Sequence, residues 1–196
     1  MTETRKHNTG AVVLIVIGIV LVAAACITAA YNAHAGSAAR QDSQRMCGAI
    51  LADWDEAVPA ASGTAQVDMA ALPVLQLEGV DVIARLTCPA LGLDIPVGAT
   101  GEDENITPVR QPKADGDAGK VVVFGKSYQG DGAFENVDSL ANGDEISLTL
   151  ANGTQLEYRV VGQGIAHEQF SDHFDLLLYY QDTQGARHWA GCSLAS

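Results

Sequence analysis

The residues that could do chemistry gather after two short apolar runs. Lys126 follows the run 121–124, while Gln181 and Arg187 lie at and beyond the end of the run 174–180. An amide both donates and accepts hydrogen bonds, and a guanidinium holds a carboxylate or an oxyanion. None of the three is an activated nucleophile. This set can bind a polar ligand but supplies no nucleophile; the alternative is that Tyr179 and Tyr180 fill the site and that it binds nothing.

Two other active-site types are disfavoured by local pattern. Gly125-Lys126-Ser127 resembles the end of a phosphate-binding loop, but residue 120 is Lys where that motif begins with Gly, and 121–124 reads as a strand. Lys126 and Ser127 are adjacent, so on an extended chain they point to opposite sides and do not form a nucleophile pair. The histidines at 167, 173 and 188 lack zinc-ligand spacing and read as surface or strand-end residues. We expect no metal and no cofactor.

Three cysteines, Cys47, Cys88 and Cys192, follow the N-terminal apolar segment. An odd number allows one disulfide and one remaining thiol in an oxidising compartment. Cys88 and Cys192 both fall on predicted strands and form the candidate pair. The alternative is that each is a small buried apolar side chain.

The region that must position these residues reads as mainly β. The Asn152-Gly153 dipeptide joins two of its strands and is a strong signal for a hairpin. A second pair of strands surrounds Gln184-Gly185, and the polar stretch 101–119 reads as a loop. Short strands without intervening helices indicate a barrel or a sandwich. The predicted strands are 80–88, one that begins after the turn at 89–92 and reaches Val97, 121–124, 144–150, 155–161, 174–180 and 187–194.

The N-terminal part predicts a membrane anchor. Residues 11–30 are largely apolar and carry no charge, and their length as a helix matches the hydrocarbon core of a bilayer. Arg5 and Lys6 precede them, so residues 1–10 are expected in the cytoplasm and the remainder outside. Two alternatives stay open: cleavage after the small-x-small sequence 33–35, and a lipid on Cys26.

Residues 37–58 form the next predicted element, an amphipathic helix with apolar residues at helical spacing. Pro59 ends it, residues 59–78 read as a linker, and residues 79–196 form the β domain. The formal net charge of -13 excludes nucleic acid as an expected partner, because phosphate binding needs basic patches.

The β domain resembles sortases, the membrane-anchored cysteine transpeptidases of Gram-positive bacteria. The resemblance is carried by the stretches 83–97, 131–146 and 156–160 in this order, and it is nearest to class B-like or small actinobacterial forms. It implies a sortase-like closed β-barrel with short helices, preceded by the anchor and the amphipathic helix.

The same resemblance implies where the catalytic residues of that family would lie. The family uses a Cys that forms a thioester, a His that ends a strand, and an Arg near the Cys. On this chain Lys126 takes the place of the His and Gln181 that of the Cys, with Tyr180 before it; a shift by one puts Tyr180 at the Cys place. Arg187 matches the Arg.

We therefore expect a catalytically inactive, sortase-like protein that acts in binding or assembly at the cell envelope. The peptide-binding candidates are Lys126, Tyr180, Gln181 and Arg187. The expected partners are cell-envelope proteins or sorting-signal peptides, and possible assembly with an active sortase is part of this hypothesis. The alternative is an active transpeptidase that attaches surface proteins or pilins with relocated catalytic residues.

Overall fold

The structure is a computed structural model that describes residues 9–58, 72–99, 107–110, 121–125, 129–166, 174–182 and 184–195. The chain divides into two compact units, Met1–Ala38 and Ala39–Ser196. The candidate site lies in the second.

Helix α1 (Thr9–Ala57) begins in the first unit and ends in the second. The predicted anchor 11–30 and the predicted amphipathic helix 37–58 are thus parts of one helix rather than two. The change from apolar to amphipathic sequence does not interrupt the helix, and a single Gly does not break it. The helix ends just before Pro59, which disfavours the helical conformation for the residue that precedes it.

In the first unit, the described apolar side chains of α1 are exposed; Leu14 is 70 % exposed and Ile27 is 69 % exposed. Across the helices of the described residues, none combines the length and the apolar character that a membrane crossing requires.

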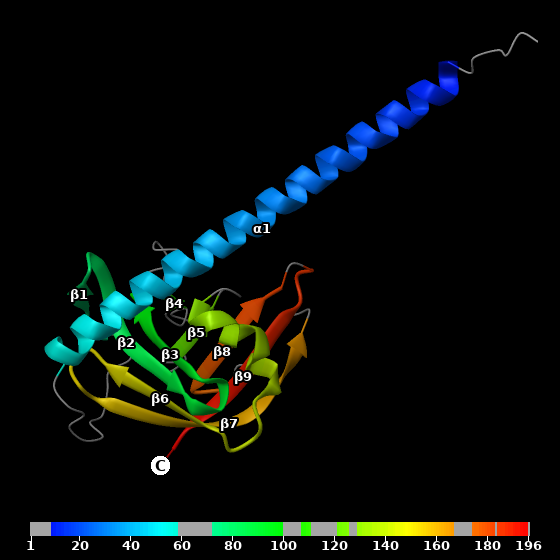
Figure 1. Ribbon diagram of the computed structural model, residues 1–196. Helices are drawn as coiled ribbons and strands as arrows, with labels where there is room; N and C mark the ends of the chain where they lie inside the picture. The colour runs from blue at the N-terminus through cyan, green and yellow to red at the C-terminus, as the bar shows by residue number, and fades with distance from the viewer. Residues whose placement is uncertain are drawn as a thin grey trace, which may run out of the picture. The chain divides into compact units, whose positions relative to one another are not determined.

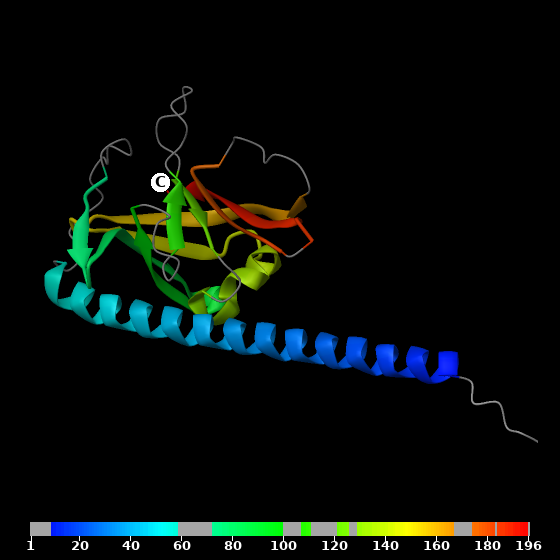
Figure 2. The ribbon, with the colours of Figure 1, turned by 90° about the horizontal axis from the view of Figure 1, so that it is seen from above.

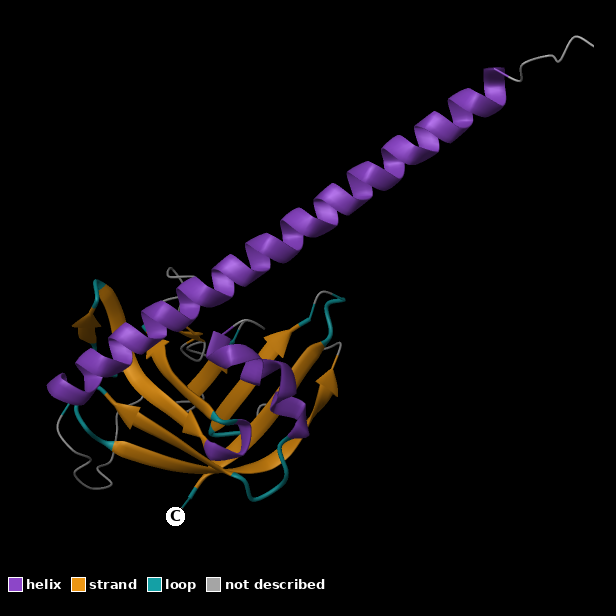
Figure 3. Ribbon diagram, in the orientation of Figure 1, coloured by secondary structure: helices purple, strands orange, loops and turns teal. Residues whose placement is uncertain are grey.

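The second unit is built on one curled sheet, shown in Figure 1 and coloured by secondary structure in Figure 3. The order of its described strands is β1-β2-β3-β4-β5-β8-β9-β7-β6. Because β6 also pairs with β2, every strand except β1 belongs to a closed ring. The pairs β3–β4 and β5–β8 are parallel and the others are antiparallel. The strands are β1 (Leu75–Leu77), β2 (Val80–Cys88), β3 (Leu93–Gly98), β4 (Thr107–Arg110), β5 (Val121–Phe124), β6 (Glu145–Leu150), β7 (Gln155–Ala166), β8 (Leu176–Gln181) and β9 (Arg187–Leu194).

Most predicted strands are present, and two additions were not expected. β1 falls at the end of the predicted linker 59–78, and β4 falls inside the predicted loop 101–119. Both are short and pair with strands that the sequence identified, β1 with β2 and β4 with β5. A strand of three or four residues has too little periodicity to be read from sequence, so only its pairing partner defines it.

The described part of the second unit also contains two 3-10 helices, η1 (Pro89–Leu91) and η2 (Gln129–Ser139). η2 packs against β3, β7, β8 and β9, and the view from above in Figure 2 shows it beside the sheet. Its Phe134 is fully buried over Gly125, where a Cβ atom would overlap the phenyl ring. The glycine after β5 therefore allows η2 to lie close to the ends of β5 and β8.

The interior of the ring is filled by apolar side chains from all sides, among them Leu86, Ile95, Leu148, Tyr158 and Leu178. A second, smaller cluster joins the end of α1 to the sheet through Cys47, Ile50, Trp54, Leu77 and Val82.

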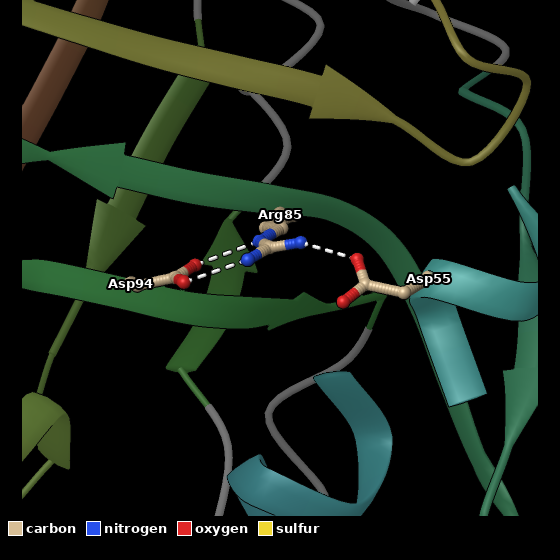
Figure 4. A network of polar contacts seen from close by, with 3 residues as sticks. All are labelled: Asp55, Arg85 and Asp94. Atoms are coloured by element: carbon tan, nitrogen blue, oxygen red, sulfur yellow. Dashed lines mark hydrogen bonds and ion pairs between the residues drawn. The ribbon is translucent and has the colours of Figure 1, made fainter. Parts of the chain in front are cut away.

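A charged contact accompanies this second cluster (Figure 4). Arg85 of β2 donates two hydrogen bonds of 2.7 Å to the carboxylate of Asp94 on β3. Its third donor reaches Asp55 of α1, also at 2.7 Å. The hydrogen bond to Asp94 is the main reason that the pKa of Arg85 lies above its usual value, against the opposing effect of burial, and Asp55 adds to it. We call Asp55, Arg85 and Asp94 the arginine clamp.

Candidate functional site

The predicted site lies where β8 ends between β5 and β9. β5 runs parallel to β8 with Phe124 beside Tyr179, and the Gly125 N–H donates to the Tyr179 carbonyl at 3.0 Å. On the other side, Gln181 lies directly opposite Arg187. The structure thus brings together the backbone positions of two predicted site residues. Lys126, the third, follows Gly125 and lies outside the described residues.

The three described binding candidates, Tyr180, Gln181 and Arg187, are nevertheless divided between two faces of the sheet. Neighbouring residues of a strand point to opposite faces, and residues directly opposite on antiparallel strands share one. Tyr180 faces the interior and is 7 % exposed, whereas Gln181 is exposed and donates to the Gly185 carbonyl at 3.2 Å. Gln181 and Arg187 therefore form an outer pair, and Tyr180 belongs to an inner group.

The inner group contains residues that the sequence analysis did not select. Tyr180 stacks on His188 of β9 with ring centroids 4.6 Å apart and an interplanar angle of 19°. Nδ1 of His188 lies 3.3 Å from Asp138 Oδ2, and Nε2 lies 3.5 Å from Asp182 Oδ2. Asp138 comes from η2 and Asp182 from the turn after β8. We call Asp138, Tyr180, Asp182 and His188 the histidine cluster.

The electrostatics of this cluster keep its phenol neutral. Burial, followed by the carboxylates of Glu135, Asp138 and Asp182, raises the pKa of Tyr180. Its ordinary value already lies near 10. Tyr180 is therefore no phenolate nucleophile at neutral pH, even in the shifted alignment that puts it at the Cys place.

Asp182 is held as an anion by the turn that follows it. Its Oδ1 accepts hydrogen bonds from the N–H groups of Gln184 and Ala186 at 2.8 and 2.9 Å. Desolvation acts to raise the pKa of Asp182, but these two backbone donors and His188 together lower it below its usual value. The charge that faces His188 is thus built into the β8–β9 turn.

The thiols of the second unit do not lie at the end of β8. None of the four cysteines forms a disulfide in the structure, so the predicted Cys88–Cys192 disulfide is not formed in it. Both of these cysteines are fully buried in the interior of the ring, and Cys47 is buried against the helix. Burial, with a contribution from Cys88, raises the pKa of Cys192 to about 12, and burial also raises the pKa of Cys88. A buried, protonated thiol is inert as a nucleophile.

The sequence missed the histidine cluster for an identifiable reason. His188 was read as a surface or strand-end residue; it does lie near the start of β9, yet its side chain is only 16 % exposed. The signal that could have placed it is the turn at Gln184-Gly185, because counting outward from it pairs Tyr180 with His188. No local signal connects Asp138 to this hairpin.

Comparison with known proteins gives structural likeness alone. No protein-family model matches the chain, and no curated protein matches it. Sortase C from Clostridium perfringens SM101 is similar to it, with 17 % identity over 59 % of this chain and 71 % of that chain and a TM-score of 0.46.

Two further sortases are similar to the chain. The Clostridium perfringens sortase D5 transpeptidase shares 19 % identity over 65 % of this chain and 84 % of that chain, with a TM-score of 0.49. Sortase E from Streptomyces avermitilis shares 20 % identity over 59 % of this chain and 88 % of that chain, with a TM-score of 0.47. These three solved structures are all sortases.

Proposed function

We propose that this protein is a sortase-like, non-catalytic binding protein of the cell envelope. It holds an extended peptide at the end of β8 and the start of β9. One observation carries the proposal. The end of β8, where the sequence resemblance puts the nucleophile, holds Tyr180 and Gln181. The cysteines of the second unit are all buried in its two apolar clusters.

The outer pair supplies the chemistry for binding. Gln181 offers both a donor and an acceptor to a peptide backbone, and Arg187 offers a guanidinium for a carboxylate. Lys126 would add a second cation in this proposal. The class of ligand, a sorting-signal peptide or the segment of an envelope protein that carries one, follows from the sequence resemblance to sortases.

The test is a titration of the full chain, in detergent micelles, with fluorescently labelled sorting-signal peptides. We expect saturable binding that weakens about tenfold in Arg187→Ala, the loss typical of one charged hydrogen bond. Arg159→Ala is the matched control, because Arg159 is an exposed arginine of β7 whose partner is Glu145. Binding that is absent, or equally weakened by both substitutions, contradicts the peptide-binding proposal.

The same sample tests for catalysis. Incubation with the peptide and an amine nucleophile, followed by mass spectrometry, should show neither cleavage nor a ligated product. A ligated product would establish the alternative of an active transpeptidase, and its loss on thiol alkylation would assign the chemistry to a cysteine.

We further propose that residues 11–30 anchor the protein in the membrane with the second unit outside. The support is a charge-free apolar sequence, the preceding Arg5 and Lys6, and the exposure of the described apolar side chains of this segment. Resistance to alkaline extraction from membranes tests the anchor. The mass of the mature chain separates an intact anchor from cleavage near Ala35 or a lipid on Cys26.

A further inference from the structure

The nitrogens of His188 both face carboxylates, and this geometry depends on the number of protons on the ring. A neutral imidazole carries one N–H and one lone pair, whereas the imidazolium carries two N–H groups. With Asp138 at Nδ1 and Asp182 at Nε2, a neutral ring necessarily directs one lone pair toward an anion. The doubly protonated ring can donate to both.

The structure identifies the nitrogen at which this matters. Nδ1 of His188 is buried and has no hydrogen-bond partner among the described residues, although Asp138 Oδ2 is 3.3 Å away. Nε2 faces Asp182, whose pKa is lowered in part by this histidine. A buried polar atom without a partner requires a specific explanation. A proton on Nδ1 removes the anomaly, since Asp138 is already within ion-pair distance.

We propose that His188 is a proton-operated latch, which ties the end of η2 to the β8–β9 turn when the ring is doubly protonated and releases Asp138 when Nδ1 loses its proton. The two carboxylates belong to separate elements, so only the charged ring joins them. The latch does not depend on peptide binding, and it concerns residues other than the outer pair.

The other groups around the ring are a phenol, an apolar side chain and a further carboxylate. Tyr180 of β8 covers one face of His188 and stays neutral, since burial and the nearby carboxylates raise its pKa. On β7, the residue opposite His188 is Ile165, which carries no charge. From η2, Glu135 contributes a further negative charge near Tyr180. Among these groups, the imidazole is the one that lies between the two carboxylates of Asp138 and Asp182, so its protonation decides whether the latch is closed.

The latch lies between the two elements that flank the end of β8, namely η2 and the β8–β9 turn. η2 carries Phe134, which packs over Gly125 after β5, and the β8–β9 turn begins beside Gln181. Locking Asp138 to the turn through His188 holds together the two elements that flank this strand end. Acidification should therefore rigidify η2, and neutral pH should loosen it.

A double-mutant cycle tests the latch with the full chain in detergent micelles. Thermal unfolding of the unmodified chain, Asp138→Asn, His188→Gln and the double variant is measured at pH 6 and at pH 8. We expect a coupling between the two positions of about 2–4 °C in Tm at pH 6 and less than half of that at pH 8. Asp53→Asn, which removes one charge from an exposed position of α1, should show no coupling to His188 at either pH.

Nitrogen chemical shifts of the imidazoles give a second readout that does not depend on the Asp138 variant. The signals of His188 are assigned by their loss in His188→Gln. We expect protons on both nitrogens at pH 6 and on Nε2 alone at pH 8. A coupling that is equal at the two pH values, or an Nδ1 that remains unprotonated at pH 6, overturns the proposal.

Discussion

The arginine clamp and the histidine cluster both place one basic side chain between two carboxylates from different elements, and they differ in how completely the contacts are made. Arg85 donates three hydrogen bonds of 2.7 Å to Asp94 and Asp55. His188 has looser contacts of 3.3 and 3.5 Å and one buried nitrogen without a hydrogen bond. A guanidinium stays charged at any physiological pH, whereas an imidazole does not. The first is therefore a permanent connection and the second a conditional one.

The largest effect should come from the apolar cluster that accompanies the arginine clamp. Trp54 of α1 is 3 % exposed in this cluster, and Trp54→Ala should cost about 3–5 kcal/mol of stability because it removes a large buried side chain. Chemical denaturation followed by circular dichroism measures the loss. Leu51→Ala is the matched control, a half-buried residue of the same helix, and should cost less than half as much. Equal losses would mean that the apolar cluster does not hold this part of α1.

The arginine clamp itself should contribute less. Arg85→Gln removes three charged hydrogen bonds, but Asp55 and Asp94 are 68 % and 44 % exposed and regain water. We expect a loss of about 1–2 kcal/mol. The loss should be the same at pH 6 and pH 8, because the pKa of Arg85 is raised further above neutrality by Asp94. A loss that changes across this range would remove the contrast with His188.

The stabilising effect of Asp182 should be lost in acid, whereas that of the His188 latch should be gained on acidification. Its pKa is lowered in the folded state, so its charge stabilises the fold above the ordinary pKa of an aspartate, about 3.9. This contribution is lost as the pH falls through the lowered folded value. Asp182→Asn, which keeps the Oδ1 acceptor for the turn, should thus be less stable than the unmodified chain near neutrality. The two Tm curves should converge below about pH 4. Parallel curves would show that the charge of Asp182 has no role.

The smallest effect is expected at an exposed ion pair. Arg159 and Glu145 are joined at 2.7 Å with 56 % and 64 % of their side chains exposed. Glu145→Gln should change the free energy of unfolding by less than about 1 kcal/mol, and salt should reduce the effect further. A larger change would mean that even an exposed ion pair stabilises this protein strongly. The effects of the arginine clamp and of the histidine cluster could then not be attributed to their special geometry.

Several parts of the fold could be predicted because their signals are local. The limits of β2, β5 and β9 match the expected strands, and Gly153 of the predicted hairpin turn has a φ of 82°, which glycine adopts without strain. The first part of the stretch 131–146, which carried family resemblance without an assigned structure, belongs to η2 (Gln129–Ser139). The predicted anchor 11–30 and the predicted amphipathic helix 37–58 lie on one helix, since α1 runs from Thr9 to Ala57.

The candidate site was less accessible to sequence reasoning. The pairing of Gln181 with Arg187 follows from one hairpin and could be anticipated. Tyr180 and Gln181 point to opposite faces of the sheet because neighbouring residues of a strand alternate, although both were predicted as members of one site. The burial of Cys88 and Cys192 in one interior depends on β2 and β9, strands that are remote in sequence.

By itself, the sequence determined the mainly β character of residues 79–196, its principal hairpins, and the presence of an amide and a guanidinium where the family resemblance expects a thiol and its partner. Those properties depend on residue type and on short-range periodicity. Tertiary structure alone decided that Asp138 meets His188 and that Arg85 joins a helix to two strands. Such contacts join residues 30 or 50 positions apart in sequence, and they exist only when the closing of the sheet brings those residues together.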